Sequence, residues 1–308
     1  MRFSILVPAY KQEFLDKALQ SILNQSCGSW ELIILNDCSP DDIRNTVSVY
    51  QDSRISYYEN AENCGAVNVV DNWNKCLSYA SGEYVICMGD DDKLDENALA
   101  QYNHYIDRFP SCDVFHTPSI KIDEQGQPLY VTNKRPEYES ATSWLRHRLL
   151  GEEQFIGDYC FKRSTLNSLG GFVKLPLAWG SDDLTALACA KNNGIVNLQR
   201  PVFFYRESSR TISRTGNAEL KMLALRQCED FFRSFLSEEC DDSLESLEKA
   251  GAFLKIGNYF FMRKMFTIAE DLSGRRSHFF KWYSMRKKYQ ISVPQLIMAL
   301  GASLRKAR

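Results

Sequence analysis

Several signatures of well-known protein classes are absent from this sequence of 308 residues. No Gly-x-Gly-x-x-Gly pattern follows the first predicted strand, where residues 7–12 read Val-Pro-Ala-Tyr-Lys-Gln, so a nicotinamide dehydrogenase is excluded. A P-loop kinase is excluded because no Gly-x-x-x-x-Gly-Lys-Ser/Thr motif occurs. No apolar run approaches the roughly 20 residues that cross a bilayer, and we find no internal repeat or low-complexity tract.

Paired cysteines and an excess of one charge are also missing. The ten cysteines include no Cys-x-x-Cys pair, and several, such as Cys87 and Cys189, lie inside apolar segments. This pattern predicts reduced, buried thiols rather than a disulfide framework or a zinc site. The net charge of -2 gives no overall attraction to nucleic acid or membrane. Because residues 1–8 contain no charged leader with a cleavage site, we expect a cytoplasmic protein.

The sequence does contain alternating strand-like and helix-like segments. Strands are predicted at residues 3–7, 30–35, 55–58 and 84–88, with amphipathic helices between them. One helix start is predicted from Ser39 as the N-cap and Pro40 at the first helical position. This alternation predicts βαβ units and a mainly parallel sheet, with the carboxyl ends of its strands at one edge.

Three consecutive aspartates, Asp90, Asp91 and Asp92, follow the strand predicted at 84–88. Carboxylates packed so closely repel one another and resist desolvation, so we expect a cation to bind there. Mg²⁺ or Mn²⁺ suits oxygen ligands of this kind, commonly with help from substrate phosphates. The alternative is a solvated acidic turn before the next helix, with Asp95 as its N-cap.

Other polar residues are expected at the same edge of the sheet, where open α/β proteins bind their ligands. They are Pro8, Ala9 and Tyr10, then Asp37, and then Asn63, Cys64 and Gly65. A nucleotide needs a base pocket, a ribose acceptor and a metal for its pyrophosphate, and these strand ends offer a place for each. Taken alone, Asp37 is equally explained as a turn or capping residue.

Five segments occur in a distinctive order: Val7-Pro8-Ala9-Tyr10, residues 36–42, Asn63-Cys64-Gly65, residues 81–84 and Asp90-Asp91-Asp92. This order resembles the family-2 glycosyltransferases with the GT-A fold, closely over about the first hundred residues and more loosely to about Ser213. The resemblance implies a Rossmann-like α/β domain, residues 1–215. A change in composition after Gly216 predicts a helical C-terminal extension, residues 216–308.

The resemblance also implies an activity. An inverting enzyme of this family moves a hexosyl or N-acetylhexosaminyl group from a nucleotide-sugar donor, commonly a uridine diphosphate sugar. The expected acceptor is a saccharide or a lipid-linked saccharide, and the expected setting is assembly of bacterial cell-envelope polysaccharide. The alternative is a catalytically inactive relative that only binds carbohydrate or nucleotide.

Residue roles follow from the same resemblance and from the shared sheet edge. The expected nucleotide-sugar contacts are Pro8, Ala9, Tyr10, Asp37, Asn63, Gly65, Asp90, Arg206 and Arg210. Asp91 or Asp92 is expected to hold the metal, Mn²⁺ or Mg²⁺. Two positions depart from the family pattern: Lys11 stands where the family often has Asn, and Gly89 where many members place the first acid of their Asp-x-Asp motif.

A second acidic pair, Asp182 and Asp183, follows Trp179 and Gly180 and opens a predicted helix. Acids in a first helical turn favour the helix macrodipole, so capping is one explanation. The other is general-base catalysis, because inverting sugar transfer requires a carboxylate that takes the proton of the acceptor hydroxyl. The segment resembles the family's Trp-Gly-x-acid-Asp stretch, which implies that Asp183 is the base and that Asp182 binds the acceptor.

The remaining candidates have weaker patterns. His116, in a strand predicted over residues 112–121, is either a core histidine or a substrate contact. The arginines of residues 206–214 form either a loop that closes over the diphosphate or a solvated connector. Beyond Arg263, basic and aromatic residues predominate, which is typical of a peripheral contact with an anionic membrane or of a solvated helical surface. A nucleic-acid partner is not expected, since no recognised motif accompanies these residues.

Overall fold

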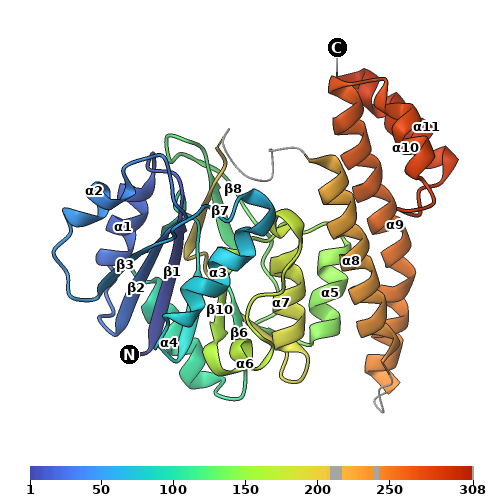
Figure 1. Ribbon diagram of the computed structural model, residues 1–308. Coiled ribbons are helices and arrows are strands. Elements are labelled where there is room, and N and C mark those ends of the chain that lie inside the picture. The colour runs from blue at the N-terminus through green and yellow to red at the C-terminus, as the bar shows by residue number, and fades with distance from the viewer. Residues whose placement is uncertain (209–216, 239–242, 307–308) are drawn as a thin grey trace.

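The computed structural model describes residues 1–208, 217–238 and 243–306, and their strands form two sheets (Figure 1). The strands of the larger sheet are β1 (Phe3–Ala9), β2 (Trp30–Asn36), β3 (Ile55–Glu59), β4 (Tyr84–Cys87), β6 (Val114–His116), β9 (Tyr138–Glu139), β10 (Tyr159–Lys162) and β11 (Ile195–Asn197). The smaller sheet contains β5 (Lys93–Leu94), β7 (Ser119–Ile122), β8 (Pro128–Val131) and β12 (Phe203–Arg206). Their orders are β3-β2-β1-β4-β10-β6-β11-β9 and β5-β12-β7-β8. In the larger sheet only β9 and β10 run against the other strands, so the predicted mainly parallel sheet is confirmed.

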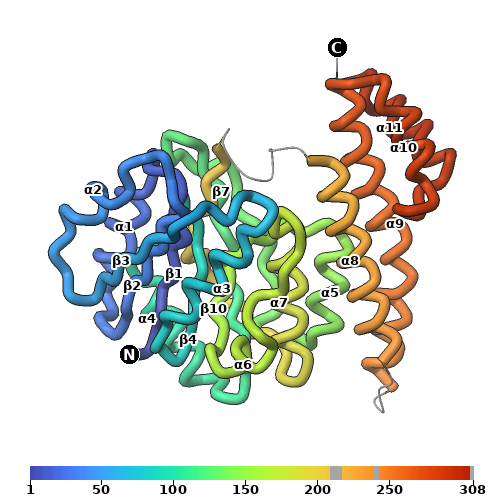
Figure 2. Tube along the Cα trace, viewed as in Figure 1, coloured from blue at the N-terminus to red at the C-terminus, as the bar shows by residue number. Residues whose placement is uncertain are grey.

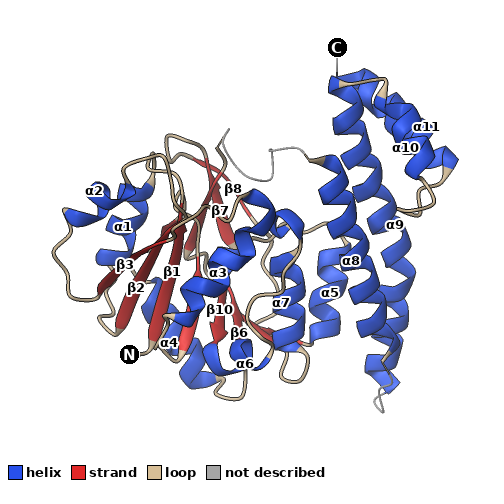
Figure 3. Ribbon diagram, in the orientation of Figure 1, coloured by secondary structure: helices blue, strands red, loops and turns tan. Residues whose placement is uncertain are grey.

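Helices cover both faces of the larger sheet (Figure 3). They are α1 (Leu15–Leu23), α2 (Ile43–Ser48), α3 (Val69–Ser78), α4 (Ala98–Arg108), α5 (Ala141–Leu149), α6 (Arg163–Ser168) and α7 (Ser181–Ala190), with short 3₁₀ turns at Ala66–Asn68, Ile156–Asp158 and Pro176–Ala178. Successive side chains of a strand point to opposite faces. Thus Ile5 and Val7 pack with α1, α2 and α4, whereas Leu6 packs with α3 and the helices α5 to α7.

The C-terminal region is helical, as expected from its composition. It comprises α8 (Ala218–Ser237), α9 (Ser243–Gly274), α10 (His278–Met285) and α11 (Val293–Lys306). The trace in Figure 2 shows α8 and α9 side by side, with α5 next to them. Buried residues of α8 and α9, such as Phe232 and Phe260, share one hydrophobic cluster with Trp144 of α5 and Leu184 of α7. Within the described ranges, no helix combines the length and the apolar character that crossing a bilayer requires.

The start of α2 differs from the sequence-based expectation. The helix begins at Ile43, and Asp42 is its N-cap, with its side chain accepting a hydrogen bond from the Asn45 amide at 3.1 Å. The predicted cap, Ser39, instead donates its hydroxyl to the Tyr10 carbonyl at 2.5 Å. The Ser39 side chain therefore joins two loops at the edge of the sheet, and the helix starts three residues later than predicted.

Two further boundaries were placed imprecisely. The strand predicted over residues 112–121 is interrupted around Pro118, which has no N–H for a ladder, and its halves β6 and β7 belong to different sheets. Asp95 does not cap α4, because the residue at the N-cap position is Asn97. The Asp95 carboxylate accepts from the Asn97 amide at 2.9 Å and stabilises the preceding turn.

The carboxyl ends of β1, β2, β3 and β4 meet at one edge of the larger sheet. Ala9 is in register with Asn36, which is in register with Glu59. The chain then leaves β4 and enters β5, which pairs with β12 of the smaller sheet. The three aspartates lie in this passage, so they sit where the two sheets meet.

Candidate functional site

A cleft of about 1080 Å³ opens at this edge. Ligand sites typically have volumes of about 300–1,000 Å³, so the cleft is large enough for a substrate of several rings. The predicted residues that line it are Pro8, Tyr10, Asp37, Asn63, Gly65, Asp90, Asp91, Asp92, Asp182 and Asp183. Helix α9 contributes Tyr259, Arg263 and Phe266 to the wall. The cleft thus brings both acidic segments of the sequence onto one surface.

Asp90 is anchored by the loop that follows β1. Its Oδ2 atom accepts hydrogen bonds from the backbone amides of Tyr10 and Lys11, each at 2.7 Å. The Lys11 ammonium lies 3.5 Å from Oδ1 of Asp90 and forms a second ion pair with Asp91. Lys11 therefore contacts the acidic cluster through both its backbone and its side chain.

Asp92 is held by backbone donors on both of its carboxylate oxygens. Oδ2 accepts from the Gly89 amide at 3.1 Å, and Oδ1 accepts from the Arg206 amide of β12 at 3.0 Å. Gly89 is needed here, because a Cβ at this position would lie 2.8 Å from carboxylate oxygens of Asp91 and Asp92. The departure from the family pattern at residue 89 thus has a steric explanation.

Burial disfavours the negative charge of the cluster. Burial raises the pKa of Asp90 to about 6, with Lys11 opposing the shift. Burial and the charge of Asp91 raise the pKa of Asp92 to about 8. Burial by itself would lower the pKa of Lys11. The three neighbouring aspartates outweigh the effect of burial, so the pKa of Lys11 is raised. A bound cation would favour the ionised carboxylates.

The donor chemistry of this cluster suits a hard divalent cation, because it consists of carboxylate oxygens. Asp91 and Asp92 are the side chains that could hold such an ion. Among the described residues, however, no three His, Cys, Asp or Glu side chains are arranged to enclose a metal. A cation here needs further ligands from a substrate or from water, as Mg²⁺ commonly takes them.

Asp37 is fixed at the end of β2 by neighbouring amides. Oδ1 accepts from Asn60 Nδ2 at 2.8 Å and from the Cys64 amide at 2.9 Å, and Oδ2 accepts from Asn63 Nδ2 at 3.2 Å. Asn60 is itself held by Asn72 at 2.8 Å. The carboxylate is buried, except for the part that faces the cleft. Asp37 therefore presents a preorganised acceptor to a ligand.

Tyr10, Pro8 and Gly65 complete this end of the cleft. The Tyr10 side chain is exposed at the rim, where its ring is free to stack on a planar group. Gly65 has φ of 74° and ψ of 161°, a conformation that is essentially limited to glycine, and it turns the chain into the 3₁₀ turn before α3.

Ala9 and Arg206, which were expected to contact a nucleotide, do not line the cleft. Ala9 has no exposed surface, because its side chain packs within the sheet. Arg206 is only 1% exposed, and its guanidinium donates to the carbonyl oxygens of Asp91 at 2.8 Å, Asp123 at 2.9 Å and Glu124 at 3.1 Å. Arg206 thus holds the aspartate loop in place from behind. Arg210 lies outside the described residues.

The second acidic pair occupies the first turn of α7. Asp183 is 3% exposed, and its Oδ1 accepts a hydrogen bond from Nε of Arg148 at 2.7 Å in a buried ion pair. Asp182 is half-buried, and burial together with the charge of Asp183 raises the pKa of Asp182 to about 7. The turn before the helix requires Gly180, whose φ is 95° and whose missing Cβ would lie 2.5 Å from Cys228 Sγ.

Several residues of the site were not found from the sequence. Lys11 and Arg148 pair with aspartates that are distant in the sequence. Only the presence of Lys at position 11, where the family often has Asn, marked one of these two residues as unusual. Tyr259 and Arg263 lie one helical turn apart on α9, a spacing that marks a shared face without saying what the face contacts. Gln154 also lines the cleft, and among the described residues its buried Nε2 has no hydrogen-bond partner.

His116 is a core residue, as one of its two interpretations predicted. It is 3% exposed, and its Nδ1 atom is hydrogen-bonded to Oδ1 of Asn197 at 2.8 Å. Burial, and to a smaller extent the charge of Arg135, lowers the pKa of His116 to about 3. The nine described cysteines are all free; six of them are buried, as expected, whereas Cys27 and Cys64 are half-buried and Cys38 is exposed.

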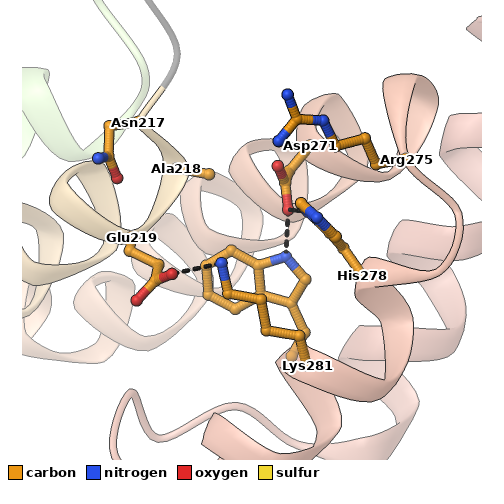
Figure 4. A pocket seen from close by; sticks show the side chains of 8 residues that line it. Asn217, Ala218, Glu219, Asp271, Arg275, His278 and Lys281 are labelled. Atoms are coloured by element: carbon orange, nitrogen blue, oxygen red, sulfur yellow. Dashed lines mark hydrogen bonds and ion pairs between the residues drawn. The ribbon is translucent and has the colours of Figure 1, made fainter.

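A smaller pocket of about 230 Å³ lies between the start of α8 and the junction of α9 with α10 (Figure 4). Asp271 accepts from Trp282 Nε1 at 2.8 Å and pairs with His278 at 2.9 Å. Lys281 forms an ion pair with Glu219. These contacts of Asp271 and Lys281 join the C-terminal helices, and Arg275 lines the same pocket.

Residues 4–156 match the family model described as "Glycosyl transferase family 2". The chain is 31% identical over 152 residues to TuaG of Bacillus subtilis (strain 168), named for teichuronic acid biosynthesis; the match covers 48% of this chain and 58% of that protein. It is 38% identical over 102 residues to a GalNAc(5)-diNAcBac-PP-undecaprenol beta-1,3-glucosyltransferase of Campylobacter jejuni, covering 32% of each. The chain thus spans about a third to somewhat over half of these relatives.

The fold is shared with solved structures of low sequence identity, including the following two. S. aureus TarS 1-349 in complex with UDP-GlcNAc superposes with a TM-score of 0.69 at 17% identity, covering 100% of this chain and 82% of that chain. The mannosyltransferase PcManGT from Pyrobaculum calidifontis, in complex with GDP-Man and Mn2+, has a TM-score of 0.54 at 17% identity, covering 99% and 86%. These similarities concern the whole chain, including the C-terminal helices.

The ion pair between Arg148 and Asp183 gives a prediction about stability. Arg148→Met leaves the Asp183 carboxylate buried without its partner, and breaking a buried pair in this way typically costs about 3–5 kcal/mol. We expect the free energy of unfolding, measured by urea denaturation, to fall by roughly that amount. Adding Asp183→Asn removes the second charge and should restore a large part of the loss.

Arg146→Met is the matched control, because Arg146 lies on the same helix with an exposed side chain. It is expected to change stability by less than about 0.5 kcal/mol. A single Arg148→Met variant as stable as the control would show that the pair is not needed to hold Asp183.

Proposed function

Because the chain belongs to glycosyl transferase family 2 and has the GT-A fold, we propose that it is an inverting glycosyltransferase. It moves a sugar from a uridine diphosphate sugar to a saccharide or a lipid-linked saccharide. The observation that carries this proposal is the single cleft that joins the Asp90–Asp92 cluster to the Asp182–Asp183 pair. The TarS complex with UDP-GlcNAc supports the choice of nucleotide, and the undecaprenol-linked substrate named for the Campylobacter protein supports the choice of acceptor.

The nucleotide binds at the carboxyl edge of β1 and β2. The exposed Tyr10 ring and Pro8 flank the base, and the fixed carboxylate of Asp37 accepts a hydrogen bond from a base or ribose group. Asn63 and Gly65 border the same end of the cleft. Since the amides of Asn60, Asn63 and Cys64 hold Asp37 before any ligand arrives, little ordering is needed on binding.

The diphosphate lies against the acidic cluster. Asp91 and Asp92 would hold Mn²⁺ or Mg²⁺ together with phosphate oxygens, and the Mn2+ in the PcManGT complex supports this assignment. When bound, the metal neutralises charge that develops on the departing diphosphate, a contribution of several kcal/mol. Arg206 holds the aspartate loop in place by donating a hydrogen bond to the Asp91 carbonyl oxygen. Asp90 holds the loop after β1 beside the aspartate loop by accepting hydrogen bonds from two of its amides.

Asp183 is the general base of this proposal. It takes the proton of the acceptor hydroxyl while that oxygen forms a bond to the anomeric carbon, and the bond from this carbon to the diphosphate breaks on the opposite face. Arg148 fixes Oδ1 of Asp183, and among the described residues no donor occupies Oδ2. Asp182, which is more exposed and has a raised pKa, binds a hydroxyl group of the acceptor.

The acceptor lies between α7 and α9. Tyr259, Arg263 and Phe266 line the cleft from α9, and Trp179 lines it from the turn before α7. The Arg263 guanidinium is 5.3 Å from the centre of the Trp179 ring. Aromatic faces beside polar side chains suit a sugar ring, which has an apolar face and hydroxyl edges. The C-terminal helices thus form one wall of the active site.

We further propose that α10 and α11 contact an anionic membrane at its cytoplasmic face. Phe280 of α10 is 77% exposed and Tyr283 43% exposed. Lys287 and Lys288, in the segment between the two helices, are exposed as well. Exposed aromatic and basic side chains together are typical of a peripheral membrane surface. A lipid-linked acceptor would be presented at the same surface.

The general-base role predicts different effects for two neighbouring substitutions. Asp183→Asn keeps an acceptor for Arg148 and removes the basicity, so transfer should fall by about 10²–10⁴-fold while uridine diphosphate binding changes little. Asp182→Asn should act mainly on the apparent KM of the acceptor, if the residue only positions that substrate. Release of uridine diphosphate in the presence of acceptor measures transfer, and calorimetry measures nucleotide binding.

Thermal denaturation of both variants is the control, because Asp183 is also part of a buried ion pair. If Asp182→Asn loses transfer and Asp183→Asn keeps it, the two roles are exchanged. If both variants stay active, the base lies elsewhere, and the role of the pair is to stabilise the first turn of α7. A wild-type protein that binds the nucleotide and transfers no sugar to any acceptor would support the binding-only alternative.

The membrane proposal predicts salt-sensitive binding to anionic lipid. The protein should sediment with phosphatidylglycerol vesicles at low salt and be released as salt screens the contact. Each lysine near such a surface contributes about 1 kcal/mol, so Lys287→Gln/Lys288→Gln should bind at least tenfold more weakly (about 1.4 kcal/mol). Lys17→Gln/Lys134→Gln removes two exposed charges elsewhere and should bind like the wild type. Absence of wild-type binding at low salt would contradict the proposal.

A further inference from the structure

Lys11 occupies the position in which a cation would neutralise the acidic cluster. Its Nζ forms an ion pair with Asp91 and lies 3.5 Å from Oδ1 of Asp90. The side chain is 19% exposed and lines the same cleft as the three aspartates, so Lys11 can be reached by a ligand that enters the cleft.

Among the described residues, Lys11 provides the side-chain cation that forms ion pairs with the cluster. Arg206 lies nearby, but its guanidinium is engaged by carbonyl oxygens of Asp91, Asp123 and Glu124 rather than by carboxylates. Asp92 accepts from two backbone amides. The ammonium of Lys11 is therefore the group that would compete with a divalent ion for Asp91.

We propose that Lys11 is an exchangeable counter-ion of the Asp90–Asp91 pair, which leaves these carboxylates when the donor diphosphate and its metal bind. This inference rests on the proposed function and deepens it. The free protein binds divalent metal weakly, because the metal competes with a tethered ammonium. The diphosphate draws the ammonium away, since a lysine side chain is flexible and binds phosphate as a point charge. Asp91, released from the ammonium, would then be available to hold the metal.

The exchange is consistent with how Lys11 is attached. The backbone amide of Lys11 donates to Asp90 at 2.7 Å, so the residue stays at the cluster when its side chain moves. The four-carbon stem allows Nζ to swing toward the cleft without rearrangement of the loop. An Asn at this position, as the resemblance implies for the family, carries no charge and could not compete with a metal in this way.

Two calorimetric titrations of Lys11→Met test the proposal, and they are expected to change in opposite directions. Mn²⁺ alone should bind the variant at least tenfold more tightly than the wild type, because the competing charge is gone. Uridine diphosphate in excess chelator should bind at least tenfold more weakly, because the ammonium no longer meets the phosphates. Lys17→Met, at an exposed position on α1, is the matched control and should resemble the wild type in both titrations.

Lys11→Arg keeps the charge and should retain the weak Mn²⁺ binding of the wild type. An unchanged or weaker Mn²⁺ affinity in Lys11→Met would overturn the proposal, and so would equal tightening in Lys11→Met and Lys11→Arg. If Lys11→Met is too unstable without metal, Mn²⁺ should raise its melting temperature by more than that of the wild type, and an equal rise would again overturn the proposal. A wild type that never binds uridine diphosphate, combined with the expected Mn²⁺ result, would refute the proposed function and the exchange with the diphosphate, and would support only the competition between Lys11 and the metal.

Discussion

The crowding of three buried carboxylates at the end of β4 is the constraint on which the site depends. Two backbone amides hold Asp90, and two hold Asp92. Because one of the donors to Asp92 is the Arg206 amide of β12, the same contact ties the smaller sheet to the larger one. The fold thus uses main-chain donors from three separate segments to stabilise charge that burial disfavours. The cluster is positioned before any ligand arrives, and the Lys11 ammonium supplies the positive charge beside it.

The second acidic pair is stabilised differently. Asp183 has a direct buried partner in Arg148, and α5, which carries Arg148, packs against α9. The C-terminal helices therefore support the proposed base and also line the cleft through Tyr259 and Arg263. Asp90 and Asp91 pair with the Lys11 ammonium, whereas Asp183 pairs with the Arg148 guanidinium, so the two acidic segments of the cleft have different partners. This division fits a donor at one end and an acceptor at the other.

Much of the architecture could be predicted because its signals are local. Strand and helix patterns alternate over the first hundred residues, and a parallel sheet brings the ends of its strands to one edge, which is why Asp37 and the aspartate cluster were expected together. The long-range pairs could not be predicted, since nothing near Asp183 points to Arg148 and nothing near Asp91 points to Lys11. The buried position of Arg206 was missed for the same reason. The start of α2 was misplaced because Ser39 and Asp42 both have the chemistry of a cap, and only the contact of Ser39 with the Tyr10 carbonyl distinguishes them.

Turnover of nucleotide sugars is the reaction that the proposed activity requires. A panel of uridine, guanosine and thymidine diphosphate sugars would be incubated with the protein, with Mn²⁺ or with excess chelator, and release of the nucleoside diphosphate would be measured. We predict release from one uridine diphosphate sugar above the rate without protein, with a strong dependence on Mn²⁺. Metal-assisted transfer from a nucleotide sugar would be contradicted if no member of the panel were turned over or bound, or if release were the same in chelator.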